Sequence, residues 1–171
     1  NGRPYSLNLG QALKKLLPLT SLESHPLLLG DESKPAGITL LTSDKSLCGA
    51  LNTNLFRLII SQGLLAGNNF YTVGKKGRNF IVRTNGILLA DFDNLDLVSF
   101  RLASQLGILM MESFLAGEIG SAYIIYPHFG STLRQEATKV KLLPIEQQEL
   151  EEAIQESETE QKEFLFDIEP V

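Results

Sequence analysis

The sequence GITLLTSDKSLCGALNTNLF, residues 37–56, contains a change from one type of secondary structure to another. Residues 37–42 form a short apolar and β-branched run, which is typical of a strand covered on both faces. A turn of small and charged residues follows, and Asn52 or Thr53 then caps a predicted helix that continues to about residue 67. This order predicts the first βα unit of an α/β domain.

The same alternation of patterns continues along the chain. Further strands are predicted at residues 70–73, 87–90, 122–126 and 136–143, with helices ending near residue 83 and spanning 96–118. This order predicts a Rossmann-like, three-layer α/β domain with a mostly parallel five-stranded sheet, helices on both faces and right-handed crossovers. Only the loop at 128–135 separates the last two strands, so a hairpin can join them.

The predicted globular domain covers residues 37–145, and both ends of the chain differ from it in composition. Residues 1–18 predict a short helical stub that Ser6 caps and Pro18 ends. Residues 146–163 carry eight glutamates and one lysine, so the acidic tail at 146–171 is predicted to begin as a solvated helix or a mobile linker.

Composition excludes several classes of function. A net charge of −5 and a pI near 5.1 argue against a general nucleic-acid binder, because phosphate neutralisation requires a basic face. The single Cys48 excludes an internal disulfide, and one cysteine with two histidines disfavours a zinc site made by this chain alone. The apolar stretch at 97–115 contains charged residues and does not resemble a membrane span.

The turn after the first strand has two possible chemical roles. Its position, between a strand and a helix start, is one where α/β proteins bind anions, but residues 43–51 contain a single glycine and match no phosphate-binding motif. Cys48 lies near a helix start, where thiolates are activated, yet a small buried hydrophobic residue is the better interpretation.

Three other groups of polar residues have ordinary structural interpretations beside any functional one. The basic sequence at 74–78 either binds an acidic partner or forms a solvated turn. Asp91 and Asp93 either coordinate a cation or form a turn. His128 is expected to be an exposed loop histidine.

Four blocks of sequence, in a fixed order, carry a family resemblance. Residues 42–56 are similar to the pattern D-R-G-L-C-G-G-L-N-x-N-L-F, and VGKKGRNF at 73–80 to a G-x-K-G segment. Residues 122–145 are similar to Y-x-x-x-N-x-F-x-S-x-x-x-Q followed by L-L-P, and FLFDIEPV at 164–171 to Y-x-x-E-P. These are motifs of the gamma subunit of F-type ATP synthases, which the chain resembles. The chain departs from them at Lys45, Ser46, Ala50, Pro127 and His128.

The resemblance implies a mechanical role. It identifies the chain with the globular domain of the central stalk, or rotor, without the terminal coiled-coil helices. Such a domain couples rotation of the membrane ring to the catalytic head and has no catalytic residue, cofactor or metal. The implied partners are the epsilon subunit and the c-ring, with the alpha/beta head reached only through the terminal helices. Neither nucleic acid nor direct membrane insertion is implied.

The resemblance also implies a location and a set of contact residues. The location is peripheral, on the cytoplasmic face of the inner membrane or the equivalent side of an organelle. The contact candidates are the polar loop residues of the matching blocks, namely Asp44, Lys45, Lys75, Lys76, Gly77, Phe129, Ser131, Arg134 and Gln135. The parallel-sheet pattern leaves one alternative, a stand-alone flavodoxin-like enzyme that binds a nucleotide or flavin.

Cys48 provides a test of the predicted strand-to-helix corner. If Cys48 and Gly49 are small residues that let the helix start pack against the sheet, the thiol should react slowly with an alkylating reagent in the folded chain. Labelling is measured under native conditions and again in denaturant. Rapid native labelling would contradict the buried placement.

Overall fold

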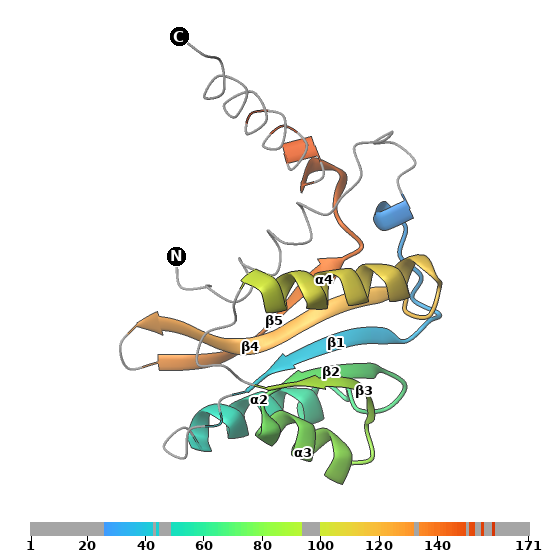
Figure 1. Ribbon diagram of the computed structural model, residues 1–171. Helices are drawn as coiled ribbons and strands as arrows, with labels where there is room; N and C mark the ends of the chain where they lie inside the picture. The colour runs from blue at the N-terminus through green and yellow to red at the C-terminus, as the bar shows by residue number, and fades with distance from the viewer. Residues whose placement is uncertain are drawn as a thin grey trace.

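The computed structural model describes residues 26–42, 44, 49–93, 100–131, 134–149, 151, 152, 155 and 159 (Figure 1). Its elements, in chain order, are η1 (Pro26–Leu28), β1 (Ala36–Leu41), α2 (Gly49–Ser61), β2 (Asn69–Val73), α3 (Lys75–Arg83), β3 (Ile87–Phe92), α4 (Phe100–Leu115), β4 (Ser121–Ser131) and β5 (Arg134–Leu143). Strands and helices alternate up to β4, as the sequence patterns predict.

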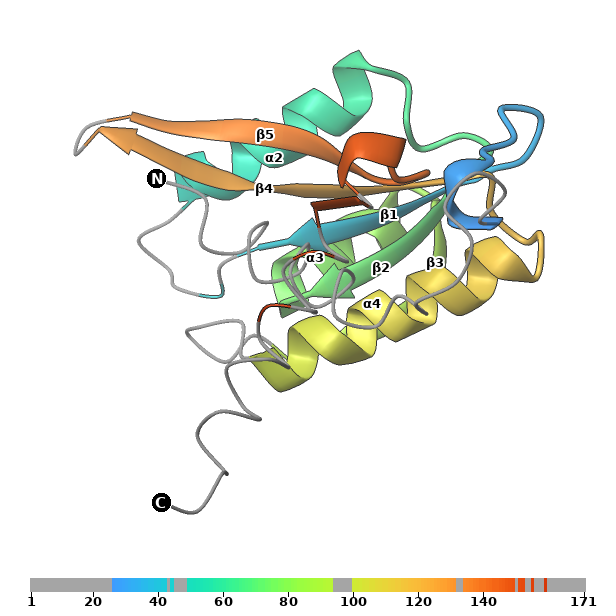
Figure 2. The ribbon, with the colours of Figure 1, turned by 90° about the horizontal axis from the view of Figure 1, so that it is seen from above.

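The five strands form one sheet in the order β3-β2-β1-β4-β5. β1 pairs in parallel with β2 and β4, β2 pairs in parallel with β3, and β5 alone runs antiparallel, against β4. Helices α2 and α3 cover one face of the sheet and α4 covers the other (Figures 1 and 2). The predicted three-layer α/β fold with a mostly parallel sheet is confirmed.

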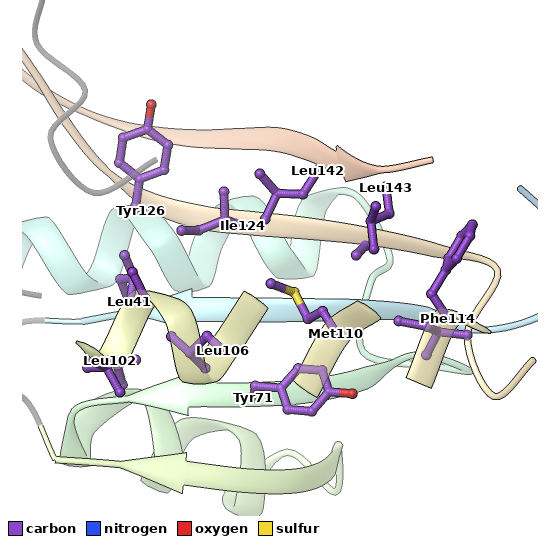
Figure 3. Packing of buried hydrophobic residues seen from close by; sticks show 14 of the residues in the cluster. Leu41, Tyr71, Leu102, Leu106, Met110, Phe114, Ile124, Tyr126, Leu142 and Leu143 are labelled. Atoms are coloured by element: carbon purple, nitrogen blue, oxygen red, sulfur yellow. The ribbon is translucent and has the colours of Figure 1, made fainter. Parts of the chain in front are cut away.

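Two apolar clusters hold the helices on the sheet, one on each face. Figure 3 shows the α4 side, where the helix and the strands meet through Leu102, Leu106, Met110, Phe114, Leu41, Tyr71, Ile124, Tyr126, Leu142 and Leu143. The cluster on the other face joins α2 and α3 to the sheet through Leu55, Ile59, Phe80, Ile81, Ile38, Leu40, Phe70 and Ile125. Adjacent strand residues point to opposite faces, so each central strand contributes to both clusters.

Helices α2, α3 and α4 are each followed by a residue with a positive φ, which is Gly63, Asn85 and Gly117 respectively. After α2, Gly63 has a φ of 63° and Leu64 N–H donates to the carbonyl of Ile59 at 3.0 Å. Gly117 has the same role after α4, with a φ of 77°. This left-handed residue satisfies the last free carbonyls and turns the chain away from the helix axis. α2 therefore ends at Ser61, several residues earlier than predicted.

Two further predictions of element boundaries were wrong. α2 begins at Gly49, so Asn52, which is 2% exposed, lies inside the helix and does not cap it. The loop predicted at 128–135 is mostly strand, because β4 runs to Ser131 and β5 starts at Arg134. Proline usually interrupts a sheet, but Pro127 lies beyond the last β1 partner of β4, on a part of the strand that pairs only with β5 among the described strands.

The core begins before the predicted domain boundary. Leu27 of η1 is 1% exposed, and its carbonyl accepts a hydrogen bond from Ile145 N–H at 2.8 Å. Asp31 N–H then donates to Gly120 O, and Gly120 N–H to Pro35 O, each at 3.0 Å. The segment before β1 is thus fastened to the start of β4 and the end of β5.

Several sequence predictions fall outside the described residues, among them the stub at 1–18, the placement of Cys48 and the block at 164–171. In the tail, the described residues 147–149, 151, 152, 155 and 159 are helical and exposed, in agreement with a solvated helix at those positions. No helix in the described part of the chain has the length and apolar character needed to cross a bilayer.

The packing of α4 can be tested with a matched pair of variants. Leu106 is 1% exposed in the core, whereas Ile108 on the same helix is 40% exposed. Leu106→Ala should lower the free energy of unfolding by about 2–5 kcal/mol, because it opens a cavity, and Ile108→Ala by about 1 kcal/mol or less. Urea denaturation measures both, and equal losses would argue against this orientation of α4.

Candidate partner-binding edge of the sheet

Thr42, the residue after β1, links two βα units of the sheet. Its N–H and its hydroxyl both donate to the carbonyl of Val73 at the end of β2, at 3.0 and 3.1 Å. The same hydroxyl oxygen accepts the N–H of Gly77 in the first turn of α3, at 3.0 Å. One side chain therefore connects β1, β2 and α3 at the carboxyl edge of the sheet.

Asp44, two residues further on, supplies the second link. Its carboxylate oxygen Oδ1 accepts the N–H of Lys75, the first residue of α3, at 2.8 Å. The residue that precedes α3 is Gly74, which has no side chain to cap the helix. Amides of the first helical turn have no partner within the helix, and here the loop after β1 provides acceptors for two of them.

Two glycines make this close approach possible. Gly74 has a φ of 101°, and a Cβ on it would lie 2.6 Å from Thr42 Oγ1 and 2.7 Å from the Thr42 carbonyl oxygen. Its N–H donates to the Phe92 carbonyl at 2.9 Å, which ties β3 to the same corner. A Cβ on Gly77, which is buried, would lie 3.1 Å from the side chain of Thr42. A larger residue at either position would push α3 away from β1.

The charged side chains at this edge differ in their surroundings. Lys75 is exposed and Lys76 is half-buried, both at the start of α3. Arg78 Nη1 lies 3.3 Å from Asp91 Oδ2, and this exposed pair contributes little to stability. Asp91 belongs to β3, so the turn predicted for Asp91 and Asp93 was wrong at Asp91.

The β4–β5 ribbon extends past the same edge. β1 stops at Leu41, and its last partner on β4 is Ile125, whereas β4 continues to Ser131 (Figure 1). At the end of the ribbon, Phe129 pairs with Gln135 and Ser131 with Arg134. Because β4 is parallel to β1, this end lies on the side of the sheet where β1 and β2 also end. The fold thus brings the candidates of two separate sequence blocks to one edge.

His128 is not the exposed loop residue that the sequence predicts. It lies in β4 opposite Glu136 of β5, and it is half-buried. Its ring is edge-on to the ring of Tyr126, with centroids 6.4 Å apart, and its Nδ1 is buried without a hydrogen-bond partner. The reason is the continuation of the strand pairing, which carries His128 into the sheet.

Sequence reasoning identified these loops but missed how they are joined. Asp44 was selected as a residue that faces a partner, and its bond to Lys75 N–H was not foreseen. One available signal was the glycine in front of α3, since a helix start that lacks a capping side chain needs acceptors from elsewhere. Lys45 lies outside the described residues, as do the side chains of the four ribbon candidates.

A cavity among the described residues lies at the opposite edge of the sheet. It has a volume of about 470 Å³ and is lined by Leu28, Lys141, Pro144, Ile145, Glu146, Gln147 and Glu149. Two carboxylates in its wall disfavour phosphate. Within the described residues, no three histidine, cysteine or acidic side chains gather as a metal site would require.

Comparison with known proteins agrees with this architecture. A family model described as ATP synthase matches residues 1–171, the whole chain. The chain belongs to the ATP synthase gamma-chain family. It is 38% identical over 144 residues to the ATP synthase gamma chain of Opitutus terrae, which covers 84% of this chain and 48% of that protein. It is 35% identical to the gamma chain of Nitratidesulfovibrio vulgaris strain Hildenborough, over 88% of this chain and 54% of the relative. This gamma-family chain spans about half the length of these relatives.

Solved structures of ATP synthases share the fold. A chain in the mitochondrial ATP synthase of Euglena gracilis (OSCP/F1/c-ring) aligns with a TM-score of 0.52 at 17% identity, over 81% of this chain and 50% of that chain. A chain in the central stalk and c-ring of the Tetrahymena thermophila mitochondrial enzyme aligns with a TM-score of 0.53 at 21% identity, over 83% and 60%. At these identities the likeness supports the fold of the gamma-family chain.

Alanine substitutions at Gly74 and Gly67 form a matched pair that tests the close packing of the start of α3 on Thr42. Both have positive φ angles, 101° and 76°, but a Cβ on Gly67 would meet no atom within 4 Å. Gly67→Ala should therefore lower the free energy of unfolding by about 1–2 kcal/mol, which is the cost of a positive φ for a residue with a Cβ. Gly74→Ala should lose about 1–3 kcal/mol more, through collision with Thr42. Denaturant unfolding compares the two, and indistinguishable losses would refute the close packing of α3 on Thr42.

Proposed function

We propose that this chain forms the globular part of the central stalk of a rotary ATP synthase and transmits torque between the membrane ring and the catalytic head. The observation that carries the proposal is the family match over residues 1–171. In this role the chain binds partner subunits and performs no catalytic step. It is held peripherally at the membrane, on the cytoplasmic face or the equivalent organelle side, by protein contacts alone.

The construction of the domain supports a torque-bearing role. Apolar clusters on both faces hold the helices to the sheet, and close-packed interiors deform little and transmit strain. The carboxyl edge adds polar ties, because Thr42 and Asp44 connect the end of β1 to the start of α3. A load applied at this edge would therefore pass to several elements at once.

We assign the partner contacts, with the epsilon subunit and the c-ring, to the carboxyl edge. Lys75 and Lys76 there carry positive charges at the start of α3, and the ribbon end at residues 129–135 lies on the same side of the sheet. Basic side chains complement acidic or carbonyl-rich loops, and such contacts weaken as salt is added. Phe129, Ser131, Arg134 and Gln135 are proposed as the contact residues of the ribbon.

The alternative of a nucleotide- or flavin-binding enzyme gains no support from the geometry. The turn at 43–51, the predicted position of an anion site, lies outside the described residues at 43 and 45–48. At the neighbouring start of α3, the amides of Lys75 and Gly77 already donate to Asp44 and Thr42. The described cavity lies at the other edge of the sheet, with Glu146 and Glu149 in its wall.

Binding to partners from the same source tests the proposal. The chain should bind an epsilon subunit or a c-ring, and the double substitution Lys75→Glu/Lys76→Glu should weaken binding by about tenfold or more at low salt. Arg57→Glu is the control, because Arg57 is exposed on α2, away from this edge. Affinity is measured by calorimetry or surface plasmon resonance at several salt concentrations. Failure of both partners to bind at tens of micromolar protein would count against the stalk role.

A further inference from the structure

We infer that Asp44 is a positioning residue, which joins the loop after β1 to the start of α3 as one docking unit, and that its carboxylate does not itself contact the partner. The inference rests on the proposed function, since it concerns how the carboxyl edge meets another subunit. It separates the role of Asp44 from that of Lys75 and Lys76, the basic residues at the start of α3 that are proposed to meet the partner.

Asp44 is exposed, and the geometry gives one of its carboxylate oxygens a role within the chain. Oδ1 accepts the Lys75 N–H at 2.8 Å, and a Cβ on Gly74 would lie 3.2 Å from the same atom. The carboxylate therefore sits against the backbone at the start of α3. Negative charge is favourable at this end of a helix, because the free amides and the helix dipole are positive there.

The bond spans a large separation in sequence. Asp44 and Lys75 are 31 positions apart, and Thr42 and Gly77 are 35 apart. Asp44 binds the first amide of α3 and Thr42 the third, so the two acceptors hold the helix start at two points. If one is lost, the described residues after β1, Thr42 and Asp44, are held to the first turn of α3 at one point only and can move relative to it.

Independent motion would lower affinity without removing any contact. A partner that touches both loops would then have to order them on binding, and this entropy cost reduces the observed affinity. The chemistry offered to a partner at the helix start is cationic, because Lys75 is exposed and Lys76 half-buried there, while Asp44 Oδ1 accepts the Lys75 amide. The partner surface that fits this unit carries carboxylates or carbonyl oxygens.

Two substitutions separate positioning from direct contact. Asp44→Asn removes the charge but keeps a side-chain oxygen that can accept the Lys75 N–H, whereas Asp44→Ala removes both. If Asp44 positions the loops, Asp44→Asn should keep partner affinity within about threefold, and Asp44→Ala should lower it about tenfold. Glu112→Ala, which removes an exposed carboxylate on α4 away from this edge, is the control and should leave affinity unchanged.

Hydrogen exchange of the Lys75 amide in the free chain provides a readout that needs no partner. Exchange should be about tenfold faster in Asp44→Ala and close to wild type in Asp44→Asn. The inference is overturned if Asp44→Asn loses as much affinity as Asp44→Ala while its Lys75 amide stays protected, since the charge itself would then be the contact. It is also overturned if Asp44→Ala leaves exchange unchanged. A wild-type chain that binds no partner, with the exchange pattern as expected, would instead contradict the proposed stalk function.

Discussion

Burial of β1 on both faces is the constraint on which the rest of the structure depends. Ile38 and Leu40 point toward α2 and α3, and Leu41 points toward α4. Thr39 lies between them, fully buried, and its hydroxyl donates to the sulfur of Met110 at 3.4 Å. A strand covered in this way must have helices on both sides, and the crossovers from β1 to β2 and from β3 to β4 supply them. The outer strands, the ribbon and the segment before β1 are arranged around this centre.

The central position of β1 also explains why the carboxyl edge is the candidate interface. The loops after β1 and β2 emerge next to each other there, and Thr42 and Asp44 join them through the amides of α3. β4 pairs with β1 and then continues beyond it, so the ribbon extends from the same edge. The proposed torque-transmitting role needs contacts held at fixed distances, and these hydrogen bonds fix the distance between the end of β1 and the start of α3.

Much of the fold was predictable because its signals are local. The apolar run at 37–42 predicts a strand buried on both faces, which the structure confirms. Arg101, Gln105 and Glu112 recur at helical spacing, and all three are exposed on the solvent side of α4. The errors occur where pairing between distant residues overrides a local pattern. Pro127 and the polar residues after it indicate a loop, yet pairing with β5 extends the strand and half-buries His128. Leu27 sits in a segment without periodicity, and only its bond with Ile145 and its packing make it a core residue.

The sequence by itself determined the order of strands and helices, the parallel sheet and the family, because periodicity, turn residues and ordered motifs are all properties of neighbouring residues. It also identified the loops that the proposed function uses. Only the tertiary structure decided what these loops do to each other. Asp44 and Thr42 cap a helix that begins more than thirty residues later, and Gly74 allows the approach. Such a contact depends on how β1 and β2 align in space, and patterns of neighbouring residues do not predict that alignment.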